Sequence, residues 1–173
     1  MKKVFFIGAM LLCGMMFNGN VANAQCDRNQ FKEGGNPIGY GVGHSVDEQT
    51  ATDDAFDAAL KEIARKTSSV LQDIVERDKR DELEKGLISR EQISKLTQQA
   101  STQITQMNVR EIKTLCQNCE EKSNGEYRCT CVLENDKAKL AEQAYKELQE
   151  NRLISSKKEM KEFRQKFNET FKN

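Results

Sequence analysis

Four of the six cysteines in this 173-residue chain lie within 16 positions of one another, and they are the residues best suited to chemistry. Cys116 and Cys119 form a C-x-x-C pair, while Cys129 and Cys131 form a C-x-C pair. Residues 123–125, Ser-Asn-Gly, carry the strongest β-hairpin turn signal in the chain. The two cysteine pairs are therefore predicted to lie on the two arms of one hairpin.

In an oxidising compartment such thiols form disulfides, which stabilise a hairpin that would be marginal alone. A three-residue loop places Cys119 opposite Cys129, and Cys116 can then reach Cys131. Four cysteines allow three pairings, so other connectivities stay open. Cys26 is the odd member of the set after the N-terminal segment: it can be free, exchange into the hairpin pairs or link two chains.

The same four thiols, Cys116, Cys119, Cys129 and Cys131, could instead hold a structural zinc ion, as in a zinc ribbon. The segment between Cys116 and Cys119 lacks the usual proline and glycine of such a site, which favours disulfides. Free thiols are a further alternative, and a redox-active disulfide is weaker still. Its attacking cysteine belongs at a helix N-terminus, where the helix dipole lowers the thiol pKa, and here Cys116 ends a predicted strand.

Other catalytic arrangements find little support in the sequence. His44 is the only histidine, which leaves few ways to build a Ser-His-Asp, Cys-His or histidine-rich metal site. The glycines of residues 38–43 do not have the spacing of a dinucleotide-binding loop. Acidic residues cluster in one short region, where they fit the start of a solvated helix better than a cation site: Asp47, Glu48, Asp53, Asp54 and Asp57. We therefore expect no catalytic residue and no cofactor.

Residues 1–24 have the pattern that is typical of a secretory signal peptide. Lys2 and Lys3 precede an apolar stretch, and residues 22–24, Ala-Asn-Ala, offer a cleavage site that would leave Gln25 first. No convincing lipid-attachment motif precedes Cys13 or Cys26, so export without lipidation is expected. Loss of two lysines leaves 25 basic against 27 acidic side chains, a net charge of −2, which does not suggest nucleic-acid binding.

The elements that must position the hairpin begin after an irregular lead-in at residues 25–37. Residues 38–43, Ile-Gly-Tyr-Gly-Val-Gly, predict a short strand whose glycines let a helix approach closely. A helix capped by Ser45 and Glu48 should follow and run to about Lys66. It carries small and apolar residues at helical spacing: Ala51, Ala55, Ala58, Ala59 and Ile63.

The middle of the chain is less regular. Residues 67–75 fit either a continuing helix or a strand, and residues 78–85 read as a solvated connection or helix end. Ser89 and Gln92 predict the start of another helix. Its apolar face comprises Ile93, Leu96, Ala100 and Ile104.

After the hairpin strands, Asp136 can cap a long C-terminal helix. Its extension, residues 151–173, is amphipathic and has a local charge of +4. Such a helix can touch an anionic membrane. A charged face beside phenylalanines buried on the domain or in a dimer explains it more simply.

The glycine-rich strand, the alanine-rich helix and the late strand near Tyr127 resemble the Lpp-twenty family of bacterial envelope lipoproteins, whose domain is similar to the N-terminal part of flagellar outer-membrane assembly proteins. The resemblance covers residues 37–150. It implies a small α+β domain in the periplasm or at the outer membrane, without enzymatic activity, and it favours a strand at residues 67–75.

The sequence thus predicts an α+β fold, with a small antiparallel sheet covered by an alanine-rich helix and a long C-terminal helix. Residues 38–150 form the domain and residues 151–173 the extension. The expected function is an exported, non-enzymatic binding or assembly module of the periplasm or outer membrane, with an envelope protein partner or self-association. The alternative is a periplasmic thiol-redox or zinc protein acting through the hairpin.

Overall fold

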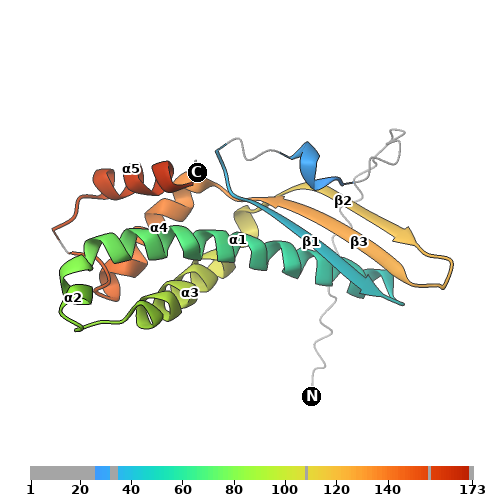
Figure 1. Ribbon diagram of the computed structural model, residues 1–173. Helices are drawn as coiled ribbons and strands as arrows, with labels where there is room; N and C mark the ends of the chain where they lie inside the picture. The colour runs from blue at the N-terminus through green and yellow to red at the C-terminus, as the bar shows by residue number, and fades with distance from the viewer. Residues whose placement is uncertain (1–25, 32–34, 108, 156, 172–173) are drawn as a thin grey trace, which may run out of the picture.

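The computed structural model describes residues 26–31, 35–107, 109–155 and 157–171 (Figure 1). The predicted signal peptide and its cleavage site lie outside these residues. The described chain has the predicted α+β class, with a three-stranded antiparallel sheet at one end and a group of helices at the other. No helix among the described residues is long and apolar enough to cross a membrane.

The sheet has the order β1-β3-β2, so the last strand lies in the middle. Strand β1 comprises Ile38–Ser45, β2 Lys113–Glu121 and β3 Tyr127–Glu134. Strands β2 and β3 form the predicted hairpin: Gly125 at its turn has a φ of 78°, and the Lys122 amide donates to the Glu126 carbonyl at 2.8 Å. A bulge interrupts β2 between Thr114 and Cys116.

Helix α1, Glu48–Asp78, lies directly on the glycines of β1, as predicted. A Cβ atom on Gly39, Gly41 or Gly43 would lie 2.1, 1.9 or 2.0 Å from a backbone carbonyl oxygen of α1. Those three carbonyls belong to the fully buried alanines of the helix: Ala59, Ala55 and Ala51. Glycines on the strand, facing alanines on the helix, therefore let the two backbones touch.

The start of α1 differs from the prediction. Strand β1 continues through Ser45, so the helix cap is Asp47, whose carboxylate accepts from the Thr50 amide at 2.8 Å. The Ser45 hydroxyl instead accepts from the Asp47 amide at 3.1 Å. The hydrogen bonds from Thr50 hold the pKa of Asp47 below its ordinary value.

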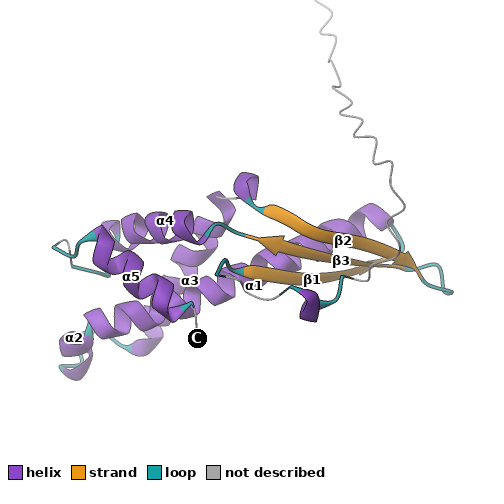
Figure 2. Cartoon of the chain, turned by 90° about the horizontal axis from the view of Figure 1, so that it is seen from above, coloured by secondary structure: helices purple, strands orange, loops and turns teal. Residues whose placement is uncertain are grey.

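The helix also continues far beyond Lys66, so the strand that the resemblance favours at residues 67–75 is wrong. Buried residues recur there at helical rather than alternating spacing: Thr67, Val70, Leu71, Ile74 and Val75. The apolar side chains of this part of α1 pack in a second core, which is formed by helices and lies beyond the sheet. Helix α1 therefore joins the two halves of the molecule (Figures 1 and 2).

The helical half is completed by α2, Arg80–Glu84, α3, Arg90–Met107, α4, Lys137–Glu150, and α5, Met160–Thr170. The predicted caps of two of them are present. Ser89 and Gln92 exchange hydrogen bonds at the start of α3, and Asp136 caps α4. Leu96 of α3 is the exception to the predicted apolar face, because 37% of its surface is exposed.

The predicted long C-terminal helix is instead two helices. Helix α4 ends where Arg152 adopts a φ of 56°, and the Leu153 amide donates back to the Leu148 carbonyl at 2.8 Å. This is the Schellman arrangement, which usually has glycine where Arg152 stands. Phe163 and Phe167 of α5 are fully buried in the helical core, in line with the simpler explanation of the phenylalanine stripe.

Candidate functional site: the cysteine hairpin

The two cysteine pairs lie on one hairpin, but the thiols are divided between the two faces of the sheet. Alternate residues of a strand point to opposite faces. Cys129 and Cys131, two residues apart, share the face covered by α1, where Cys119 also lies. Cys116 is three residues from Cys119 and lies on the opposite face, in a cluster with Cys26 and Val132.

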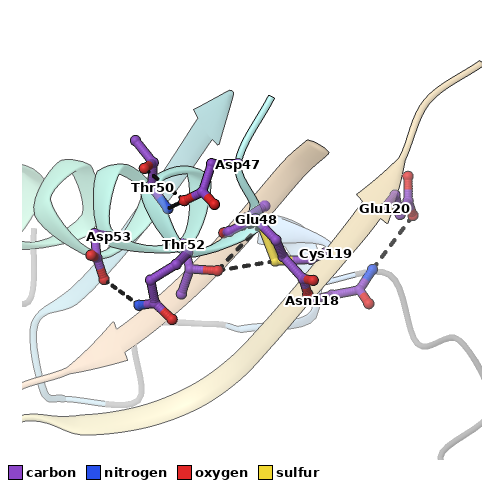
Figure 3. The surroundings of a disulfide bond; sticks show 10 residues. Asp47, Glu48, Thr50, Thr52, Asp53, Asn118, Cys119 and Glu120 are labelled. Atoms are coloured by element: carbon purple, nitrogen blue, oxygen red, sulfur yellow. Dashed lines mark hydrogen bonds between the residues drawn. A yellow bond between two sulfur atoms is a disulfide. The ribbon is translucent and has the colours of Figure 1, made fainter. Parts of the chain in front are cut away.

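Cys119 and Cys129 form the first disulfide. They are direct partners in the β2–β3 register, with their Cα atoms 4.1 Å apart, as the three-residue loop predicts. The disulfide lies against the first turns of α1 (Figure 3). The Thr52 hydroxyl oxygen is 3.3 Å from the Cys119 sulfur and 3.4 Å from the Cys129 sulfur.

Cys26 and Cys116 form the second disulfide, with Cα atoms 5.8 Å apart. The expectation that Cys116 reaches Cys131 is therefore wrong, because the sheet itself separates the two thiols. Of the three possibilities for Cys26, the structure shows exchange into the hairpin set. This bond ties the lead-in, with its short 3₁₀ helix Arg28–Gln30, to the face of the sheet opposite α1.

Cys131 is the free cysteine of the described chain and is 1% exposed. Burial raises the pKa of its thiol to about 11. A thiol with this pKa and this burial is unreactive near neutral pH. Cys131 therefore acts as a small core residue beside Ala55 and Leu133.

The structure brings together no metal site from these cysteines. Four of them are paired in disulfides, and the described residues hold no group of three or more histidine, cysteine or acidic side chains with metal-binding geometry. His44 is exposed near the end of β1, where its strand partner is Arg128. The acids at the start of α1 lie on its exposed or half-exposed surface.

A groove that the sequence does not predict lies between α1 and α3. It encloses about 640 Å³ and is lined mostly by hydroxyl and amide side chains, including Ser68, Ser94, Gln98 and Thr102. Lys61 and Arg65 stand on the α1 side. In the sequence, polar residues that line a groove look the same as polar residues on a solvated helix face. The groove becomes visible only when α1 and α3 are placed side by side in the structure.

Comparisons with known proteins give no relative: no family model, no curated protein and no solved structure matches this chain. The resemblance to the envelope lipoproteins therefore stays a prediction.

Proposed function

We propose that the protein is an exported, non-enzymatic binding or assembly module of the bacterial periplasm or outer membrane. The observation that carries this proposal is the pair of disulfides Cys26–Cys116 and Cys119–Cys129. Structural disulfides persist in oxidising compartments and are rare in the cytosol. The signal-peptide pattern of residues 1–24 supports the same compartment independently.

A binding or assembly role fits the surfaces better than catalysis does. The single histidine is exposed on a strand, and the free thiol is buried and protonated. The molecule offers instead a polar groove and a three-stranded sheet with β1 and β2 as its two edge strands. Its partners in this proposal are envelope proteins or a second copy.

Cell fractionation followed by mass spectrometry of the intact protein tests the proposal. Material from the periplasmic or outer-membrane fraction should begin at Gln25 and carry no acyl chains. A Lys3→Glu, Lys2→Glu variant, which removes the positive start of the signal, should accumulate unprocessed. Recovery of uncleaved protein in the cytosol, or of a species beginning at an acylated Cys13 or Cys26, would contradict the proposal.

A thiol-redox role is the second candidate, and one observation favours it. Half-buried Cys119 lies 3.3 Å from the Thr52 hydroxyl, near the N-terminal end of the 31-residue α1 (Figure 3), where the positive end of the helix dipole favours a thiolate. The sequence could not predict this proximity, because α1 precedes Cys119 by many residues and only the fold brings the two together. An insulin-reduction assay separates the two roles: turnover that Cys119→Ser abolishes and Cys116→Ser retains would favour the redox role.

A further inference from the structure

The outer edge of β1 is closed over only half of its length. In an antiparallel edge strand, alternate residues direct both backbone polar groups away from the sheet. Two of these groups bind α1 side chains: the Ile38 carbonyl accepts from the Lys66 ammonium at 2.8 Å, and the Tyr40 amide donates to the Glu62 carboxylate at 2.8 Å. Glu62 and Lys66 thus occupy the place of a neighbouring strand.

The other half of the edge is open. By the same alternation Val42 and His44 direct their amides and carbonyls outward, and neither residue has a partner for these groups among the described residues. The α1 position one turn before Glu62 is Ala58, which has no polar group to bind Val42. Val46, at the end of this open half, is 76% exposed.

The opposite edge of the sheet is less suited to pairing. Strand β2 has a bulge between Thr114 and Cys116, and Glu120 and Glu121 are exposed at its end. Bulges and charged side chains are the devices that keep edge strands from pairing. The open half of β1 has neither.

A second copy does not fit the open edge. Antiparallel pairing of two β1 strands about a two-fold axis would set them about 4.8 Å apart with both α1 helices on the same face. The backbone of α1 lies directly over β1, so the two helices would be much closer than the roughly 8 to 10 Å that packed helices need. The occupant must therefore bring no helix on this face.

Charge defines the occupant further. From Asp47 to Leu60, the region that runs beside the open edge, the chain holds five acidic residues and no basic one. Asp54 lies against this part of β1, since its Cβ is 2.9 Å from the position that a Cβ on Gly43 would take. A segment with lysine or arginine side chains would be attracted to this region, and an acidic segment would be repelled.

We infer that the open edge of β1, from Val42 to Ser45, binds an extended basic segment of a partner protein as an added strand. Backbone hydrogen bonds to Val42 and His44 give the binding, and the acids of α1 select for charge. This inference rests on the proposed role as a binding module and names the class of its partner.

Peptide binding to the purified, oxidised mature protein tests it. The probes are two fluorescent eight-residue peptides, one alternating lysine and valine and one alternating glutamate and valine. Fluorescence anisotropy should show binding of the lysine peptide at least tenfold tighter than of the glutamate peptide. NMR should show slowed exchange of the Val42 and His44 amides. Equal binding of both peptides, no binding, or protection at Gln117 and Cys119 of β2 would overturn the inference.

Two variants make the test specific to the edge. Ala58→Gln adds an amide that can bind Val42 as Glu62 binds Tyr40, without changing the charge, and should weaken the lysine peptide at least tenfold. Ala138→Gln, on the exposed surface of α4, is the matched control and should leave its affinity unchanged. If Ala58→Gln and Ala138→Gln changed the affinity for the lysine peptide equally, the inference would be refuted. Since purified protein is used, these results are independent of whether the chain is exported.

Discussion

Asp78 and Lys158 form an ion pair that fastens the segment between α4 and α5 to the end of α1. The Lys158 side chain is 5% exposed and that of Asp78 19%. Burial alone would raise the pKa of Asp78. The hydrogen bonds from Lys158 and the Ser155 amide, with the charges of Lys158 and Lys166, outweigh burial and hold this pKa below its ordinary value of 3.8.

Replacing this carboxylate should leave a buried lysine without its partner. We expect Asp78→Asn to lower the free energy of unfolding by about 2 to 4 kcal/mol at pH 7, measured by urea denaturation. Asp73→Asn, which disrupts an exposed pair with Arg77 on the same helix, should cost less than about 0.5 kcal/mol.

The difference in unfolding free energy between wild type and Asp78→Asn should depend on pH in a defined direction. Because the folded pKa of Asp78 is lowered, its contribution is complete above the unfolded pKa and is lost as the pH falls through the folded one. The gap between wild type and Asp78→Asn should therefore close below about pH 4. A gap that persists in acid would show that the ion pair is not its cause.

The close contact between α1 and β1 depends on the glycines of the strand. We expect Gly41→Ala to destabilise the protein by about 3 kcal/mol or more, since its Cβ would lie 1.9 Å from the Ala55 carbonyl oxygen and two backbones must separate. Val42→Ala, on the other face of the same strand, should cost about 1 kcal/mol. Thermal unfolding followed by circular dichroism compares them, and equal losses would contradict the close contact.

The end of α4 offers a stabilising substitution. Arg152 has a left-handed backbone, which costs a residue with a side chain roughly 1 kcal/mol. Arg152→Gly should therefore raise the free energy of unfolding by about 0.5 to 1 kcal/mol in the same urea measurement. Arg164→Gly, in the interior of α5, should lower it by about 1 kcal/mol. A loss at both positions would mean that α4 does not end in this way.

Local signals predicted the β2–β3 hairpin and the starts of α3 and α4, because turn and cap chemistry acts within a few residues. The predicted cap of α1 at Ser45 was wrong, because β1 continues through that residue and Asp47 caps the helix. The Ser-Asn-Gly turn, the Ser89–Gln92 box and the Asp136 cap are examples. The break at Arg152 was missed because its residue type carries no termination signal. Among the cysteines, the Cys119–Cys129 disulfide could be predicted from the position of the hairpin turn. Strand alternation already separates Cys116 from Cys131, but only the tertiary fold brings Cys26 to Cys116.

At the scale of the whole molecule, the two disulfides differ in how much chain they close. Cys26 and Cys116 are 90 positions apart, and Cys119 and Cys129 are 10 apart. Chain-entropy estimates give about 4.6 and about 2.7 kcal/mol for loops of these lengths, in a model-dependent way. Removing Cys26 and Cys116 together by serine should therefore lower the melting temperature more than removing Cys119 and Cys129. If removing Cys119 and Cys129 lowered the melting temperature more, the hairpin disulfide would be the larger contributor to stability.

The proposal most in need of a test is that the protein works outside the cytoplasm with the Cys26–Cys116 and Cys119–Cys129 disulfides formed. Differential alkylation and peptide mapping of protein isolated from the cell envelope test it most directly. The account predicts no alkylation of the folded protein, one alkylated thiol, Cys131, after unfolding without reductant, and five after reduction. Peptides joined through Cys26–Cys116 and Cys119–Cys129 should be recovered. Five free thiols in the unreduced protein, or a Cys116–Cys131 bond, would contradict the account.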